Sequence, residues 1–281
     1  MTAADRWAQA LEARAIPQRI IDAAPASPWG FPTEAFRSRA RRAASRRVPT
    51  PTTTRAREAL PASGTVLDVG VGGGATSLPL ADRAALIIGF DQQGDMLEVF
   101  GEAARAAGVG ADTVEGRWPD DHEAAPAVDV VMSGHTVYNV PDLGQFVLAL
   151  DAHARSRVVL EATDRHPLGW MSDLWLRFHG IVIADAPAVD LAIGLMGSIG
   201  IDVSREDRSE GLDDPSAGGF ESREGAVALI RTRLCLPASR DADIAEALGD
   251  RLRLRHGLWT AGPPSRTVVT LWWDTDHDEP S

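Results

Sequence analysis

The sequence predicts a doubly wound α/β domain, in which a mostly parallel sheet carries helices on both faces. From Thr65 onward, short apolar runs alternate with amphipathic stretches, as in parallel strands that are joined by helices. The first run leads directly into a glycine-rich turn, which is typical of the first crossover in such sheets. The chain of 281 residues is long enough to bury one large core around this sheet.

Seven apolar runs are the strand candidates of this sheet. They cover residues 65–70, 85–91, 112–118, 128–133, 157–161, 201–206 and 267–273. Before them, residues 1–60 contain helical segments separated by proline-rich breaks, and we expect them to form an N-terminal helical cap or lid. The main domain should then occupy residues 61–281.

Two connections in the main domain exceed the usual length of about 2–6 residues. We expect insertions near residues 165–200, after the fifth strand, and 209–265, after the sixth. Each should carry a helix, because apolar residues recur there at helical spacing: Met171, Leu174, Trp175 and Phe178 in the first, and Ile244, Ala245, Leu248 and Leu252 in the second. Loops beyond the carboxyl ends of strands can vary without disturbing the core, so we expect the substrate pocket here.

Composition narrows the range of functions. The formal net charge of −12 argues against a general nucleic-acid binder, because phosphate contacts need clustered positive charge. The chain has no lysine, which excludes a P-loop lysine and a Schiff base. The arginine-rich stretch 37–47 predicts a helix with a solvated basic face, and the alternative is an RNA-binding arm. The lone Cys235 and the lack of a long apolar run predict a cytoplasmic protein without a membrane partner.

The glycine-rich turn after the first strand is the most informative segment. Gly70, Gly72 and Gly74 allow a tight turn and a close approach to a ligand, since a side chain would stand in the ligand's place. Asp68 lies two residues before the first of these glycines. Asp91 ends the next strand, where a carboxylate can accept hydrogen bonds from both ribose hydroxyls of a nucleoside. Together these residues predict an adenosine-containing ligand.

Two cofactors are compatible with this turn. Gly70, Gly72 and Ala75 also satisfy Gly-x-Gly-x-x-Ala, the dinucleotide pattern. The carboxylate of Asp68, however, suits a ligand that carries an ammonium and a sulfonium, and it would repel the pyrophosphate of NAD. The residues therefore favour S-adenosyl-L-methionine, with a nicotinamide dinucleotide as the alternative.

The turn from Asp68 to Gly74 resembles motif I of class I S-adenosylmethionine-dependent methyltransferases, Asp/Glu-x-Gly-x-Gly-x-Gly. The resemblance covers residues 65–161. It implies a Rossmann-like sheet of seven strands, mostly parallel with an antiparallel last strand, and S-adenosyl-L-methionine as the cofactor. Later stretches, among them 223–237, look like a poorly characterised branch of the small-molecule methyltransferases, which indicates no particular acceptor.

The second motif of this family is similar to residues 89–97. In the family its acidic residue holds the ribose, a role that falls here to Asp91, and the residues that follow flank the adenine, which implies Gln92 and Met96. Two alternatives stand beside these roles. Asp91 could cap the following helix, and Met96 could be a core residue, because apolar side chains are usually buried for packing.

The third and fourth motifs imply further contacts. The third lacks its usual aspartate here, so we expect Arg117 and Trp118 to line that end of the adenine pocket, with buried packing as the alternative for Trp118. Residues 130–142 are similar to the fourth motif, in which the strand ends beside the transferring methyl group. Ser133 and Gly134 fall at that place.

His135 is the candidate base. Methyl transfer is an in-line displacement that requires alignment of the two reactants and exclusion of water. A hydroxyl or protonated amine acceptor must also lose a proton, and His135 follows the fourth strand directly. Tyr138, the only tyrosine, is a second catalytic candidate through its hydroxyl. The alternatives are a structural histidine and a tyrosine in ordinary interior packing.

The insertion after the fifth strand is rich in aromatic and imidazole groups. They predict a pocket wall for an apolar or aromatic acceptor, and the residues concerned are His166, Trp170, Trp175 and His179. The alternative is a helix that packs its apolar stripe on the sheet. No metal site is expected, since the sequence has no Cys-x-x-Cys or His-Glu-x-x-His pattern.

These observations predict an S-adenosylmethionine-dependent methyltransferase that acts on an unidentified small molecule by in-line transfer. The alternatives are an NAD(P)-dependent oxidoreductase and a nucleic-acid methyltransferase or cofactor-binding regulator. The first lacks a recognisable hydride-transfer pair. The second lacks a base-flipping motif and any basic surface beyond residues 37–47.

Overall fold

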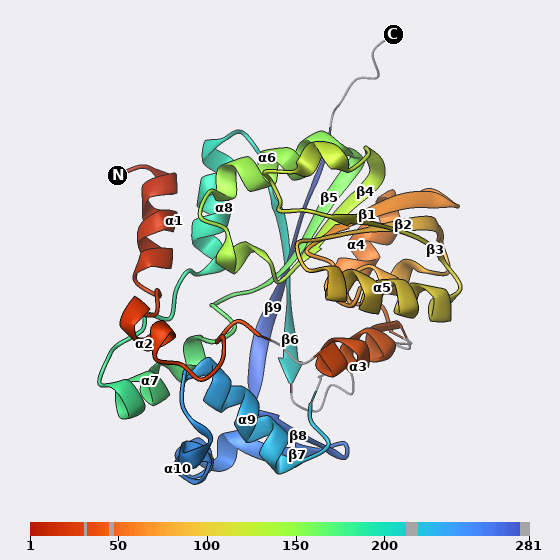
Figure 1. Cartoon of the computed structure of the whole chain (residues 1–281). Coiled ribbons are helices and arrows are strands. Elements are labelled where there is room, and N and C mark those ends of the chain that lie inside the picture. Colours follow the sequence, from red (N-terminus) through yellow and green to blue (C-terminus); the bar gives the residue numbers. More distant parts are fainter. Residues whose placement is uncertain (31–32, 45–47, 212–218, 276–281) are drawn as a thin grey trace.

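The computed structural model describes residues 1–30, 33–44, 48–211 and 219–275. Its centre is a seven-stranded sheet in the order β3-β2-β1-β4-β5-β9-β6 (Figure 1). Only β9 runs antiparallel to its neighbours, which confirms the predicted fold class. The strands are β1 (Gly64–Val69), β2 (Ala84–Asp91), β3 (Gly110–Glu115), β4 (Val128–Gly134), β5 (Ala154–Thr163), β6 (Ser204–Gly211) and β9 (Ser265–Asp274).

Six of the seven strands lie close to their predicted ranges, and β6 is displaced toward the carboxyl end. Its sequence is almost entirely polar, and its charges are paired at the surface, for example Arg205 with Asp207 at 2.7 Å. The apolar residues that suggested a strand at 201–206 are Ile201 and Val203. They pack on the core from the connection that precedes β6.

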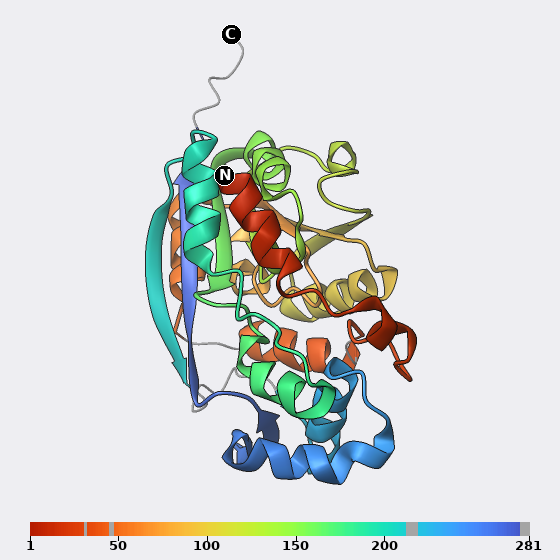
Figure 2. The same ribbon diagram turned by 90° about the vertical axis from the view of Figure 1, so that its left-hand side faces the viewer.

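Helices cover both faces of the sheet (Figure 2). On one face, apolar residues of α1 (Ala3–Glu12), α6 (Leu143–His153) and α8 (Val189–Ser198) share a core with the strands. On the other face, α4 (Pro51–Ala59) and α5 (Gly94–Ala107) form a second core with them. The inner strands are consequently buried on both sides, as their continuous apolar runs predicted.

A separate cap lies beyond the carboxyl ends of the parallel strands (Figure 1). It has its own apolar cluster, which confirms that both insertions carry helices. Its elements are α2 (Gln18–Asp22), α7 (Ser172–His179), α9 (Arg223–Arg233), α10 (Asp241–Leu248) and the hairpin of β7 (Leu252–Arg255) and β8 (Leu258–Ala261). The prediction that Leu252 continues the helix was wrong: α10 ends at Leu248, because Gly249 at φ +51° reverses the chain into the hairpin.

The first sixty residues do not form one cap. Trp7 of α1 is buried in the main core, where its indole N–H donates to the carbonyl of Val140 at 2.8 Å. Helix α4 packs on β4, β5 and β9. Only α2 joins the cap, and α3 (Thr33–Ala44) lies against the glycine-rich turn. Of residues 1–60, which were predicted to form a lid, α1 packs on α6 and α8 and α4 packs on the sheet, so these two helices lie outside the cap.

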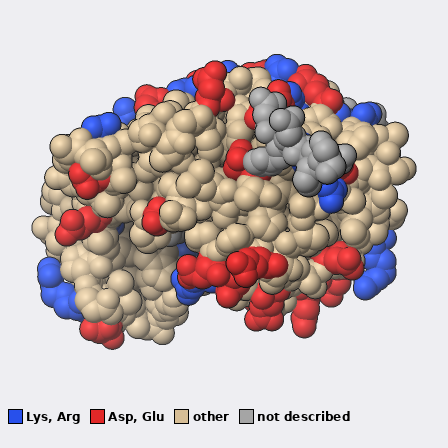
Figure 3. Space-filling view, turned by 90° about the horizontal axis from the view of Figure 1, so that it is seen from above, with Lys and Arg blue, Asp and Glu red and all other residues tan. Residues whose placement is uncertain are grey.

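Two surface features bear on possible partners. No helix in the described ranges is long and apolar enough to cross a bilayer. On the face opposite the cap, acidic and arginine side chains are interspersed, and the described residues there form no continuous basic surface (Figure 3). Of the arginine-rich stretch 37–47, residues 45–47 lie outside the described residues.

Candidate active site

The turn after β1 requires glycine at the predicted positions. Gly70, Gly72 and Gly74 have φ values of +70°, +50° and +81°, which side chains rarely adopt. A Cβ at Gly70 would overlap the side chain of Thr136. A Cβ at Gly74 would lie 2.8 Å from the ring of Phe100. The turn therefore presents bare backbone at the carboxyl edge of the sheet.

Asp91 ends β2 and ties this turn to the neighbouring strand. One carboxylate oxygen accepts the N–H of Gly72 at 2.9 Å, and the other accepts the N–H of Gln93 at 3.1 Å. Burial raises the pKa of Asp91, and the backbone hydrogen bonds counteract this effect. Each carboxylate oxygen can accept a further hydrogen bond. Asp91 thus supports the start of α5, the alternative noted above, and also faces the cavity described below.

Asp68 lies beneath the turn. Its Oδ2 accepts the hydroxyl of Ser77 at 2.6 Å, and its Oδ1 is buried without a hydrogen-bond partner among the described residues. Burial raises the pKa of Asp68 to about 7, and the charges of Asp91 and Glu161 add to this effect. A positively charged group near the turn would favour the ionised carboxylate.

A cavity of about 1400 Å³ separates the carboxyl edge of the sheet from the cap. Twelve of the predicted site residues line it: Gly70, Gly72, Asp91, Gln92, Met96, Arg117, Trp118, Gly134, His135, Tyr138, His166 and Trp170. Five others do not, namely Asp68, Gly74, Ser133, Trp175 and His179. The cavity wall thus includes most of the predicted site residues, and their roles stay predictions.

Trp118 fixes one end of the cavity. Its indole N–H donates to the carbonyl of Phe146 at 3.2 Å, and its ring meets the ring of Phe90 edge to face at 5.1 Å. Met96 is buried and also reaches the cavity wall from α5. Both residues therefore combine packing with pocket lining, and a flat apolar ring could lie between them.

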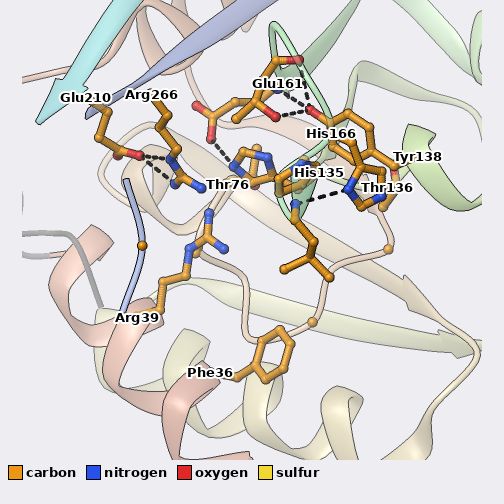
Figure 4. A pocket seen from close by; sticks show the side chains of 18 of the residues that line it. Phe36, Arg39, Thr76, His135, Thr136, Tyr138, Glu161, His166, Glu210 and Arg266 are labelled. Carbon is orange, nitrogen blue, oxygen red and sulfur yellow. Dashed lines mark hydrogen bonds and ion pairs between the residues drawn. The ribbon is translucent and has the colours of Figure 1, made fainter. Parts of the chain in front are cut away.

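His135 and Glu161 form the polar centre of the cavity. Nε2 of His135 lies 3.2 Å from Oε1 of Glu161, and Oε2 of Glu161 accepts the hydroxyl of Thr52 at 2.7 Å (Figure 4). Burial lowers the pKa of His135, and the contact with Glu161 only partly offsets it. The pKa of Glu161 lies below its usual range despite burial, because His135 and Thr52 stabilise the carboxylate. The imidazole is therefore neutral at neutral pH.

The tautomer of His135 follows from this contact. A neutral imidazole next to a carboxylate carries its proton on the nitrogen that faces it. We therefore assign the proton to Nε2, which leaves a lone pair on Nδ1. Both ring nitrogens are buried without a hydrogen-bond partner among the described residues, and Nε2 is the one that lies 3.2 Å from a carboxylate oxygen. Glu161 was not among the predicted site residues. It lies on β5 opposite the end of β4, and no sequence motif marks this position.

Two polar candidates of the fourth motif are occupied elsewhere. Ser133 is buried between β1 and β4, where its hydroxyl donates to the carbonyl of Val69 at 2.7 Å. The ring of Tyr138 lines the cavity, but its hydroxyl lies 2.7 Å from Oγ1 of Thr163, and burial raises its pKa to about 12. The hydroxyl of Ser133 is thus engaged inside the sheet, and we assign no chemistry to the hydroxyl of Tyr138.

The aromatic insertion divides into two parts. Trp170 and His166 line the cavity, and Nδ1 of His166 accepts the N–H of Leu168 at 3.0 Å. Burial, with a contribution from Arg14, lowers the pKa of His166 to about 3, so this ring is neutral. Trp175 is buried in the cap cluster instead.

His179, on the same helix, contacts the carbonyl of Leu234 through Nε2 at 2.6 Å. For Trp175 and His179 the prediction of a pocket wall was wrong. The alternative, a helix that packs its apolar stripe on the sheet, differs from the structure as well, because the stripe packs within the cap.

Charged residues that sequence analysis had not assigned to a site lie beside His135. Nε of Arg266 on β9 donates to Glu210 on β6 at 2.5 Å. Arg39 extends from α3 toward this pair and toward His135 (Figure 4). Neither strand carries a motif. Arg39 belongs to the arginine-rich stretch that was interpreted as a solvated face.

Comparison with known proteins finds a protein family that matches the parallel strands and the glycine-rich turn. Residues 66–156 match a family described as a methyltransferase domain. This part of the chain is therefore similar to methyltransferase domains. The match begins in β1, includes the glycine-rich turn, Asp91 and His135, and ends in β5. It confirms the resemblance inferred from the sequence.

Individual proteins are similar to this chain over part of its length or at low identity. An uncharacterized protein of Haemophilus influenzae is 31% identical over 103 residues, which cover 36% of this chain and 38% of the relative. A cyclopropane-fatty-acyl-phospholipid synthase-like protein from Lactobacillus casei has a TM-score of 0.51 at 14% identity, covering 91% of this chain and 97% of that one. The YcgJ protein of Bacillus subtilis has a TM-score of 0.50 at 16% identity, covering 81% and 98%. The solved structures support the fold.

Proposed function

We propose that this methyltransferase transfers a methyl group from S-adenosyl-L-methionine to a small molecule that binds in the cavity below the cap. The observation that carries the proposal is the carboxylate of Asp91, which lies on the cavity wall and is held at 2.9 Å from the glycine-rich turn. A nucleoside that lies across bare turn backbone can bring its ribose hydroxyls to such a carboxylate. The family match favours this activity over the nicotinamide-dependent alternative.

The described residues fit this cofactor. Gln92, Met96, Arg117 and Trp118 surround the space next to Asp91, where an adenine would lie. The unpartnered oxygen of Asp68 beneath the turn suits the ammonium of the cofactor's amino-acid end. When bound, the cofactor supplies a methyl group on a positively charged sulfur, which departs as a neutral thioether.

The volume of the cavity leaves room for an acceptor. Pockets for a single small ligand measure about 300–1,000 Å³, and this cavity measures about 1400 Å³. The cap contributes Leu168, Trp170 and Phe220 to its wall. These apolar side chains exclude water from the reaction and favour an acceptor with an apolar body.

His135 is the residue that we propose as the base. A hydroxyl or amine acceptor forms its new bond to carbon as its proton passes to Nδ1 of His135, and Glu161 stabilises the resulting imidazolium from the opposite side of the ring. A thiolate or carboxylate would react without this transfer.

A cytoplasmic location stays a prediction from the lone cysteine.

The variant Asp91→Asn tests the cofactor site. It should weaken binding of S-adenosylhomocysteine, measured by titration calorimetry, by about 10- to 150-fold, because hydrogen bonds to an ionised carboxylate contribute about 1.5–3 kcal/mol. Asp95→Asn is the matched control: this exposed side chain lies four residues away, outside the cavity wall. Equal affinity in wild type and Asp91→Asn would exclude Asp91 from the ribose site.

A further inference from the structure

Arg39 is a cation on the cavity wall that lacks a direct partner. Its guanidinium makes no hydrogen bond or ion pair with any residue in the described ranges. Burial lowers its pKa, Arg266 adds repulsion, and the charges of Glu161 and Glu210 attract it from a distance. Arg39 is half-buried on the wall of the cavity, and a guanidinium in such a place usually has an anion beside it. In this cavity a ligand can supply that anion.

The nearby carboxylates are already engaged. Glu161 contacts His135 and accepts the hydroxyl of Thr52. Glu210 accepts Arg266 at 2.5 Å and lies 3.5 Å from Arg208. Together with Arg39, this cluster has three guanidinium groups and two carboxylates, and His135 is neutral. Among the described residues, these two carboxylates therefore make their direct contacts with partners other than Arg39.

The position of Arg39 relates it to the acceptor and not to the adenosine end. Its electrostatic neighbours Glu161, Glu210 and Arg266 belong to β5, β6 and β9. These strands form the half of the sheet beyond β4, whereas Asp91 ends β2 on the other side of β1. Figure 4 shows the guanidinium of Arg39 between the Glu210–Arg266 pair and His135. A group bound there lies beside the proposed base.

We propose that the methyl acceptor carries a carboxylate and that Arg39 binds this carboxylate. The inference rests on the proposed function and adds the substrate class. A guanidinium can donate two parallel hydrogen bonds to a carboxylate, which fixes the acceptor's orientation toward His135. The cap wall of Leu168, Trp170 and Phe220 takes the apolar remainder. The acceptor is thus an amphipathic carboxylic acid.

The test uses 3-phenylpropionate and its neutral amide as probes of protein saturated with S-adenosylhomocysteine. At constant ionic strength, the acid should raise the melting temperature of the wild type in a dose-dependent manner, and the amide should not. Arg39→Met should weaken the response to the acid by about tenfold or more, because charge-assisted hydrogen bonds are lost. Arg39→Lys should retain part of it, because the charge is kept.

The matched control is Arg37→Met. Arg37 lies on the same helix, but its side chain is 38% exposed and pairs with Glu102 at 3.1 Å. This variant should respond to 3-phenylpropionate as the wild type does. Circular dichroism of each variant establishes that the fold is intact.

Three outcomes would overturn the proposal. They are a wild type that does not distinguish the acid from the amide, an Arg39→Met variant that responds fully, and an Arg39→Met variant that loses affinity for S-adenosylhomocysteine. The last outcome would assign Arg39 to the carboxylate of the cofactor itself. If the wild type does not bind S-adenosylhomocysteine at all, the proposed function fails, independently of the role of Arg39.

Discussion

His135 and Glu161 are joined twice. The backbone N–H of His135 donates to the carbonyl of Glu161 at 2.7 Å, and Nε2 of its ring lies 3.2 Å from Oε1 of the same residue. The backbone of His135 has a φ of +59°, which turns the chain out of β4 at the point where Gly134 pairs with Glu161. The orientation of the ring is therefore set by the two strands and not by a flexible loop.

Replacing Glu161 should lower the pKa of His135 further. Burial already lowers this pKa, and Glu161 opposes the effect through its hydrogen bond and its charge. Glu161→Gln removes the charge and keeps the shape, so the imidazole should titrate at a lower pH than in the wild type. Nitrogen-detected NMR titration of the histidine rings measures this without any acceptor.

Glu206→Gln is the control for this titration, because Glu206 of β6 pairs with Arg55 of α4 at 2.7 Å. It should leave the titration of His135 unchanged. An unchanged or raised pKa in Glu161→Gln would mean that the carboxylate does not position the imidazole.

His135→Ala should separate binding from turnover. With a hydroxyl or amine acceptor, the turnover number should fall by about 10²- to 10⁴-fold, the usual effect of losing a general base. Affinity for S-adenosylhomocysteine should stay within about twofold. Since the pKa of His135 is lowered from 6.5, wild-type turnover should be constant near pH 7 and should decline only as the pH falls below 6.5.

His256→Ala serves as a control for His135→Ala, because His256 is exposed in the turn between β7 and β8 and lies outside the cavity wall. It should leave turnover per folded protein unchanged. If His135→Ala retained full turnover with such an acceptor, His135 would be a structural residue.

Asp68→Asn should become more stable relative to the wild type as the pH rises. The pKa of Asp68 is 3.8 in the unfolded chain and about 7 in the folded protein. Between these values the unfolded chain releases a proton that the folded protein retains, so this group lowers the wild-type free energy of unfolding by about 1.4 kcal/mol per pH unit. Above pH 7 both states are ionised and the effect is constant. Asparagine has no such dependence.

Urea unfolding at pH 5, 6 and 7 measures this difference. Asp95→Asn, at an exposed position on α5, should show the same pH dependence as the wild type. Parallel stability curves for wild type and Asp68→Asn would show that Asp68 is ionised throughout this range.

Sequence patterns predicted the parts of the fold that depend on local chemistry. The buried strands are continuous apolar runs, and the glycine-rich turn has positive φ values at each of its three motif glycines. The reasons for these glycines differ, however. At Gly74 a side chain would meet Phe100, whereas at Gly72 it would approach the ring of Phe36, 3.1 Å away on α3. Both neighbours come from segments that are distant in the sequence, so no local pattern reveals them.

The charged half of the site could not be predicted for the same reason. Arg39 and Arg37 belong to one arginine-rich helix, but only Arg39 lines the cavity. Helical spacing gives the angle between two side chains and does not say which one meets the sheet. Glu210 lies on β6, whose polar sequence lacks the apolar run that predicts a strand. Tertiary packing alone brings these residues to His135.

A melting experiment with S-adenosylhomocysteine, NAD and NADP tests the proposal that this protein uses S-adenosyl-L-methionine as its cofactor. S-adenosylhomocysteine at 100 times its dissociation constant should stabilise the wild type by about 2.7 kcal/mol. Neither dinucleotide should shift the melting temperature, because Asp68 beneath the turn repels a pyrophosphate. A shift with NAD or NADP and none with S-adenosylhomocysteine would contradict the proposed methyltransferase function.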